Sequence, residues 1–222
     1  MIHPKILILL LLALCGQGCA TKKVSVDYDE FKQSDPKSIL VLPPINHSYE
    51  LDAVASINAN VTRPLAEAGY YVFPMALVSE TFTQNGYTIV EEIHQLAPSK
   101  LHDVFASDAA LYIEIHKYGT AYSLLASDTV VSLSARLVDL RTGIVLWQGR
   151  AQAASSEERA DNDSGLVAMM FSAVVHQILD SAFDVSFDIS KKAINRLFST
   201  SKHNGILNGP RSDKYHKIHS YH

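Results

Sequence analysis

Residues 128–153, DTVVSLSARLVDLRTGIVLWQGRAQA, predict two long antiparallel strands and decide the fold of the chain. Apolar and polar residues alternate over Val131–Leu137, as they do in a strand with one buried and one solvated face. Residues 140–143 form the predicted connection, in which Gly143 can adopt the positive φ that short hairpin loops require. The second strand carries Trp147, the only tryptophan. This stretch indicates architecture and no chemistry.

Residues 38–73 predict a β-α-β unit. Residues 38–42, SILVL, are a short apolar run typical of a strand buried on both faces. Apolar residues three and four apart over Val54–Ala68 predict a helix that Gly69 ends and that Pro64 kinks or restarts. Tyr70–Phe73 is the second strand, which should run parallel to the first.

The segment between this unit and the hairpin predicts two helices and a strand. The helices are Met75–Gln84 and Pro98–Phe105, and between them Tyr87–Ala97 is expected to be a loop with at most one helical turn. Ala109–Lys117 alternates as a strand and, with the hairpin, should form an antiparallel meander; Tyr118–Ser127 is its connection. The predicted fold is therefore α/β, a mixed sheet of about five strands packed with helices.

The segment after the hairpin predicts helices and then a tail. Residues 155–163 are a polar loop, and apolar spacing predicts a long helix over 166–182 and a second helical segment over Asp188–Phe198. The apolar period ends at Ser199, so residues 199–222 are expected to be disordered. These boundaries predict one α/β domain over residues 38–198.

The N-terminus predicts an export signal. Residues 1–18 contain one lysine and an apolar run that is too short to span a membrane. Gly16-Gln17-Gly18-Cys19 resembles a lipobox, with a small residue before the cysteine whose thiol takes diacylglycerol and whose freed amine takes an acyl chain. Cys15 fits less well, because Leu14 precedes it. Cys19 is the predicted lipid attachment site; simple secretion and an uncleaved anchor are the alternatives.

The residues after Cys19 predict a tether and a compartment. Residues 19–37 are polar and predict a lipidated tether with little order before Ser38. Ala20 follows the cysteine in place of an aspartate, which favours sorting to the outer membrane. The net charge is −4 and no basic face is evident, which argues against nucleic acid as a partner. Cys15 is expected to leave with the signal and Cys19 to carry the lipid, so no disulfide is expected.

Reactive residues predict no catalytic, cofactor or metal site. The chain has no Walker loop, GxGxxG, GxSxG, HExxH or CxxC motif. His216, His219 and His222 recur every third residue and offer ligands for Zn²⁺ or Ni²⁺, but an unstructured polar tail is the favoured interpretation. Glu114 and Arg136 share the polar face of the meander, where a cross-strand pair is expected. His116 is expected on the same face as a surface residue.

Five short motifs occur in order along the chain: SILVLPP at 38–44, GYYVFP at 69–74, ETF at 80–82 with NG at 85–86, YGT at 118–120 with Tyr122, and LVDLRTG at 137–143 with LW at 146–147. With these motifs the chain resembles a family of bacterial outer-membrane lipoproteins typified by a Neisseria surface antigen, a family of unknown function. The resemblance covers Cys19 to Ala154 and, more loosely, the helix after it; Ala106-Ser107 departs from it where the family commonly has Gly-Ala.

The resemblance implies a fold and a location. At fold level the family is similar to the TolB amino-terminal domain, CsgG-like lipoproteins and a lipoprotein that activates penicillin-binding proteins, all anticodon-binding-like α/β domains. It implies a periplasm-facing outer-membrane lipoprotein that is often encoded beside a CsgG-like lipoprotein, and it does not imply an enzyme. Fold analogy alone supplies no function.

Three functions are weighed from these observations. The first is a non-catalytic, lipid-anchored component of an envelope assembly, for export or envelope maintenance, with a CsgG-like lipoprotein or a second copy of itself as partner. The second is a lipoprotein regulator of peptidoglycan synthesis. The third is a hydrolase or a metal-binding protein with an unrecognised site.

Overall fold

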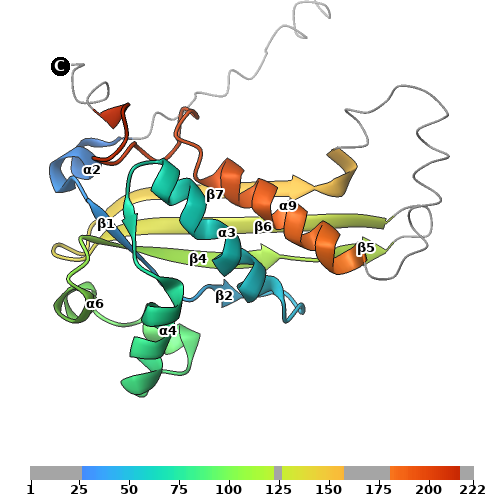
Figure 1. Ribbon diagram of the computed structural model, residues 1–222, viewed down its shortest axis with the longest axis horizontal. Helices are drawn as coiled ribbons and strands as arrows, with labels where there is room; N and C mark the ends of the chain where they lie inside the picture. Colours follow the sequence, from blue (N-terminus) through green and yellow to red (C-terminus); the bar gives the residue numbers. More distant parts are fainter. Residues whose placement is uncertain (1–26, 123–126, 158–180, 216–222) are drawn as a thin grey trace, which may run out of the picture.

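The computed structural model describes residues 27–122, 127–157 and 181–215 (Figure 1). The predicted signal peptide, Cys19 and nearly all of the helix predicted over 166–182 lie outside these residues. Among the helices that are described, none has the length and apolarity needed to cross a membrane.

The strands form one mixed sheet, as predicted. β1 pairs in parallel with β3 and β4, and β6 pairs antiparallel with β4 and β7, which confirms both the β-α-β unit and the meander. Two short strands that were not predicted are added: β2 pairs in parallel with β4, and β5 pairs with the start of β6. The strands are β1 Ser38–Val41, β2 Ile45–Asn46, β3 Tyr71–Val72, β4 Ala109–Lys117, β5 Thr120–Tyr122, β6 Ser127–Asp139 and β7 Val145–Ala154.

α3, α4 and α6 form where they were predicted, but α9 begins at Ser181 and so runs through the break that was predicted before Asp188–Phe198. Of the two alternatives predicted at Pro64, a kink or a restart, the restart is wrong, because α3 runs through this residue. Val61 and Leu65 on either side of the proline are both fully buried, and their packing holds the two turns in one helix. Gly69 follows α3 with φ +98°, as expected of a helix-ending glycine. The helices are α2 Asp29–Ser34, α3 Ala53–Glu67, α4 Met75–Gln84, α5 Val90–His94, α6 Pro98–Phe105 and α9 Ser181–Leu197.

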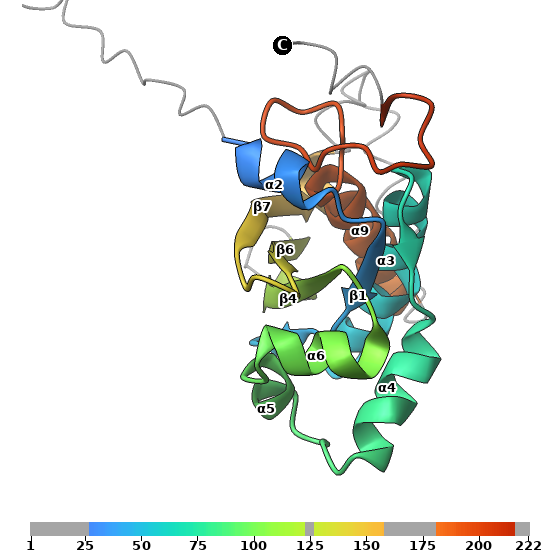
Figure 2. The ribbon, with the colours of Figure 1, turned by 90° about the vertical axis from the view of Figure 1, so that its left-hand side faces the viewer.

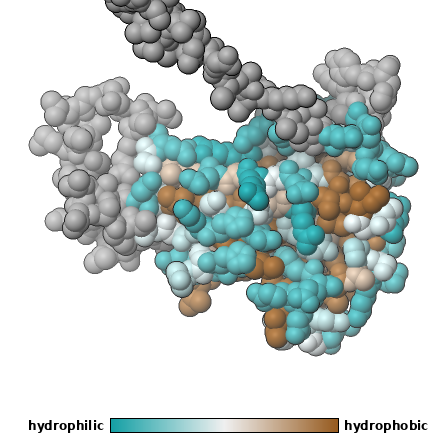
Figure 3. Space-filling view, turned by 180° about the vertical axis from the view of Figure 1, so that it is seen from behind, coloured by the Kyte–Doolittle hydropathy of each residue, from teal (hydrophilic) through white to brown (hydrophobic). Residues whose placement is uncertain are grey.

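The sheet has a large core on one face and a small one on the other. α3 and α9 lie together over the first face (Figures 1 and 2), where Ile57, Leu133 and Ile194 are among the buried residues. On the opposite face, α4, α5 and α6 bury a smaller cluster that includes Leu40 and Tyr112. The rest of this second face carries polar side chains, and hydrophilic residues predominate over the middle of the molecule when it is seen from behind (Figure 3).

The turn of the central hairpin is organised by Asp139. Its Oδ1 accepts hydrogen bonds from the backbone N–H groups of Arg141 and Thr142, each at 2.8 Å, and its Oδ2 accepts one from the Ser34 hydroxyl at 2.5 Å. Burial by itself raises the pKa of the Asp139 carboxyl, but the hydrogen bonds from Ser34, Thr142 and Arg141 together outweigh it and hold the pKa below its ordinary value. Gly143, at φ +76°, closes the turn.

We expect Asp139→Ala to lower the free energy of unfolding by about 1–3 kcal/mol near neutral pH, because it leaves three donors without their acceptor. The folded-state pKa lies below the unfolded value of about 3.9, so the carboxylate stabilises the fold above that value. The contribution is lost as the pH falls through the folded-state pKa. Urea unfolding at a series of pH values should show the two proteins converging in acid. Asp139→Asn keeps an acceptor and should cost less; a difference between wild type and alanine variant that ignores pH would contradict this assignment.

Residues 199–215 are folded, so the prediction of a disordered tail from Ser199 is wrong over this segment; residues 216–222 lie outside the described part of the chain. Ile206 is fully buried. The Tyr70 hydroxyl donates to the Leu207 carbonyl at 2.6 Å, and the Trp147 indole N–H donates to the Asn204 carbonyl at 3.1 Å. The contacts of this segment are made by single side chains and by backbone carbonyls. Its sequence therefore shows no helical or strand period from which its folding could be predicted.

Residues 27–37 also belong to the folded domain, which corrects the tether predicted over 19–37. Phe31 of α2 is buried in the large core. The Tyr28 hydroxyl donates to the Gly205 carbonyl at 2.5 Å, and the Tyr215 hydroxyl donates to Asp35 Oδ1 at 2.6 Å. Both ribbon views accordingly place α2 beside the C-terminal segment (Figures 1 and 2). α2 was not predicted because its six residues are too few to show the apolar spacing of a helix with one buried side.

Candidate functional site

A polar cluster lies on the second face of the sheet, beyond the part that α4, α5 and α6 cover; this uncovered part is called the open face. Here β2, β4 and β6 run side by side. Glu114 and His116 are two residues apart in β4, so both side chains project from the same face. His47 follows β2, and its backbone N–H donates to the Ile115 carbonyl at 2.9 Å, which places it next to these residues. Ser134 of β6 lies directly across from Glu114 in the antiparallel register.

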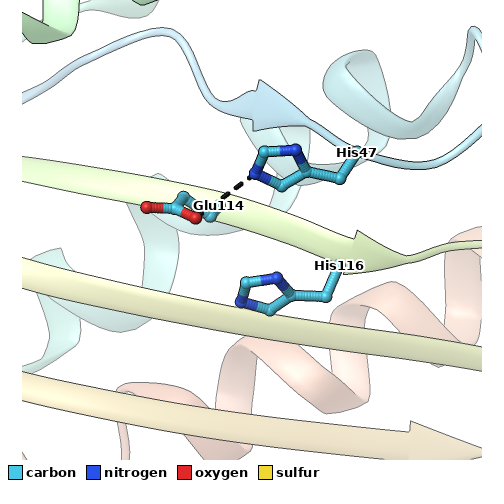
Figure 4. A group of neighbouring side chains, drawn as sticks. All are labelled: His47, Glu114 and His116. Atoms are coloured by element: carbon cyan, nitrogen blue, oxygen red, sulfur yellow. Dashed lines mark hydrogen bonds and ion pairs between the residues drawn. The ribbon is translucent and has the colours of Figure 1, made fainter.

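The side chains of His47, Glu114 and His116 converge. His47 Nε2 lies 3.3 Å from Glu114 Oε2, and one ligand atom from each of the three residues lies within 4.8 Å of the others. The two imidazole rings are parallel, with centroids 5.9 Å apart and an interplanar angle of 8° (Figure 4). His116 Nε2 also makes a 2.7 Å hydrogen bond with the Ser134 hydroxyl.

Arg136 does not pair with Glu114 as predicted. The register of β4 and β6 sets Tyr112 opposite Arg136, and the guanidinium lies over the Tyr112 ring at 4.2 Å from its centroid. The His94 ring lies perpendicular to the same ring with centroids 5.2 Å apart, and His94 Nε2 makes a 2.8 Å hydrogen bond with the Pro43 carbonyl. Burial lowers the pKa of His94. On this face of the sheet, the small core is therefore followed first by the cation–π pair of Arg136 and Tyr112 and then by the polar cluster.

The cluster is accessible to solvent and rich in ligand atoms. The side chains of His47 and Glu114 are 51% and 44% exposed. In the part of the chain that the structure describes, no other group of three histidines, cysteines or acidic residues converges in this way. Two imidazoles and a carboxylate are suited to binding a cation.

The sequence analysis found part of this site. It placed Glu114 and His116 on the polar face of one strand, which the structure confirms. It did not find His47, because that residue reaches the cluster through the parallel pairing of β2, a strand of two residues without a recognisable period. His203 is exposed, while His216, His219 and His222, like the predicted lipid attachment site Cys19, lie outside the described residues.

A shallow hollow of about 750 Å³ lies on the other side of the molecule, between α3 and α9. It is lined by charged and neutral side chains alike, among them Arg63, Glu67 and Lys191. Arg63 and Glu67 pair with each other at 2.8 Å across one turn of α3, as solvated helix residues commonly do. The hollow offers a contact surface but no group of reactive side chains.

Comparison with known proteins places the chain in a family. The model of a family described as "Putative lipoprotein GNA1162-like" matches residues 26–211. A lipoprotein of Neisseria meningitidis serogroup B, NMB1124/NMB1162, is 48% identical over 200 residues, which cover 89% of this chain and 92% of the relative. The crystal structure of lipoprotein GNA1162 from Neisseria meningitidis is 49% identical and superposes with a TM-score of 0.52, covering 66% of this chain and all of that one. The chain belongs to the GNA1162-like lipoprotein family.

Proposed function

We propose that this protein is a lipid-anchored component of an outer-membrane assembly that acts through protein–protein contacts and not through catalysis. The observation that carries the proposal is the sequence Gly16-Gln17-Gly18-Cys19 ahead of a domain that belongs to a lipoprotein family. Two or three acyl chains, each contributing about 0.8 kcal/mol per buried methylene, hold a protein durably at a membrane. Ala20 supports sorting to the outer membrane. That the domain faces the periplasm is proposed from the family resemblance.

The folded domain supports a role in contacts. Its open face presents Arg136, His47 and Glu114 to solvent, while the larger core is closed beneath α3 and α9. The description of the matching family names lipoproteins and no reaction. We propose a CsgG-like lipoprotein or a second copy of the chain as the partner, on the resemblance given by the five sequence motifs.

The short link to the membrane distinguishes this proposal from regulation of peptidoglycan synthesis. Residues 20–26 separate Cys19 from Asp27, and even a fully extended chain over these eight steps reaches at most roughly 29 Å. The domain is thereby held close to the membrane that carries the lipid. Contacts with other proteins at the same membrane are favoured over docking on a synthase in the opposite membrane.

Replacing the lipid attachment residue tests the anchor. We expect Cys19→Ala to leave the membrane fraction almost completely, since the thioether that carries the diacylglycerol cannot form. Mass spectrometry of the wild-type N-terminus should show an acylated cysteine at residue 19. Cys15→Ala is the matched control and should remain lipidated and membrane-bound. A Cys19→Ala protein that still sediments with membranes and resists salt extraction would refute the anchor.

Crosslinking from native membranes tests the contacts. A photo-crosslinking residue at Arg136 probes the open face, and the same residue at Arg63 probes the opposite, helical side; both positions are exposed. We expect a discrete adduct from Arg136, either with a lipoprotein partner or with a second copy. A protein that is monomeric and gives no adduct from either position would contradict the proposed role.

A further inference from the structure

We propose that His47, Glu114 and His116 bind a divalent transition-metal ion of the Zn²⁺ class on the open face of the sheet. The proposal rests on the convergence of three ligand side chains from two adjacent strands. It does not depend on the proposed role in an envelope assembly, and it can fail or hold independently of that role.

The donor set selects the class of metal. Two imidazole nitrogens and one carboxylate oxygen are the ligands of choice for borderline cations such as Zn²⁺, whereas Mg²⁺ and Ca²⁺ prefer shells made of oxygen alone. Neutral imidazoles add no charge, so the carboxylate of Glu114 leaves a bound divalent ion with one positive charge in excess. Three protein ligands also leave a coordination position open to water or to a side chain from a partner.

The distances fit this coordination after a small movement. With metal–ligand bonds of about 2.0–2.1 Å, neighbouring ligand atoms of a tetrahedral site lie about 3.3 Å apart. The separation of His47 Nε2 and Glu114 Oε2 is already 3.3 Å, while the widest separation in the cluster is within 4.8 Å. His116 is exposed, so its ring can turn toward the other two without disturbing the core.

The backbone and a neighbouring hydroxyl hold the ligands in place. β4 fixes Glu114 and His116 on one face, and the hydrogen bond from the His47 N–H to the Ile115 carbonyl fixes the third ligand beside them. The Ser134 hydroxyl contacts Nε2 of His116 at 2.7 Å, the kind of outer partner that orients metal-bound histidines. A metal ion can take Nδ1 of His116 without breaking this contact, or Nε2 once the hydroxyl turns away.

Zinc titration of the full, untagged chain tests the site. The histidines at 216, 219 and 222 are first replaced by alanine, so that the His-rich end contributes no ligands. We expect saturable one-to-one binding of Zn²⁺ against a competing chelator, with no comparable binding of Mg²⁺. His47→Ala and His116→Ala should each weaken binding at least about 100-fold and Ser134→Ala about tenfold, since even outer-shell partners are worth 10–100-fold.

Two further measurements separate a lost ligand from a damaged fold. His203→Ala removes an exposed histidine away from the cluster and should bind Zn²⁺ as tightly as its parent. Co²⁺ should give visible d–d absorption bands in the parent protein, and Glu114→Gln, which keeps the shape of the side chain, should abolish them without changing the circular dichroism spectrum. Zinc affinity that survives both His47→Ala and Glu114→Gln, or saturation that requires millimolar Zn²⁺, would overturn the assignment.

Discussion

Trp147→Ala should lower the free energy of unfolding by about 3–5 kcal/mol, the range found when a buried aromatic side chain is removed from a core. Trp147 is only 2% exposed. Its ring packs against Phe198 with centroids 5.9 Å apart, and its indole N–H donates to the Asn204 carbonyl at 3.1 Å. The ring also covers the Cα of Gly149, where a Cβ atom would lie 2.3 Å from it. Its removal therefore opens a cavity and also takes the indole donor away from the Asn204 carbonyl.

Chemical unfolding of matched variants measures this contribution. Trp147→Phe retains an aromatic ring but not the indole N–H, so its loss should be smaller than that of the alanine variant. Leu77→Ala removes a side chain that is 56% exposed on α4 and should change the free energy of unfolding by no more than about 0.5 kcal/mol. A loss below 1 kcal/mol in Trp147→Ala would show that Phe198 and the C-terminal segment are not held by this ring.

Elements with a long apolar period could be predicted from the sequence. β4, β6 and β7 are each nine or more residues long and contain stretches of alternation, and α4 and α6 begin and end at the predicted residues, since a proline precedes or opens each of them. β2 and β5 were not predicted, because strands of two or three residues are too short to show an alternation of apolar and polar residues. Their strand character comes from pairing with neighbours that are distant in sequence.

The same distinction between local and long-range features applies to the candidate site. The side on which Glu114 and His116 project follows from alternation within one strand, which is a local property. The approach of His47 and the stacking of Arg136 on Tyr112 depend on the register between strands. Register is set by the hydrophobic pattern of the whole sheet and by its turns, so no single segment discloses it.

Deleting residues 199–222 should destabilise the domain by about 3 kcal/mol or more, whereas deleting residues 216–222 should leave the free energy of unfolding nearly unchanged. The longer deletion removes the buried Ile206 side chain, worth about 1.5–3 kcal/mol. It also takes away the acceptors of the Tyr70 hydroxyl and the Trp147 indole, each costing about 1–3 kcal/mol when a buried donor is left unpaired. The shorter deletion keeps all of these contacts. Equal stability of the two shortened proteins would show that residues 199–215 do not support the fold.

A substitution at Gly69, on the domain side, also tests whether the C-terminal segment packs against the domain. Its φ of +98° disfavours any other residue, and a Cβ atom there would lie 2.5 Å from the Ser212 nitrogen and 2.7 Å from the Gly209 carbonyl oxygen. In the full chain, Gly69→Ala should therefore lose about 1–2 kcal/mol to backbone strain and a further 1–3 kcal/mol to overpacking. In the chain that ends at residue 198 only the strain remains, so the cost of the substitution should fall by about half. An unchanged cost in the two backgrounds would mean that the C-terminal segment does not lie on this turn in solution.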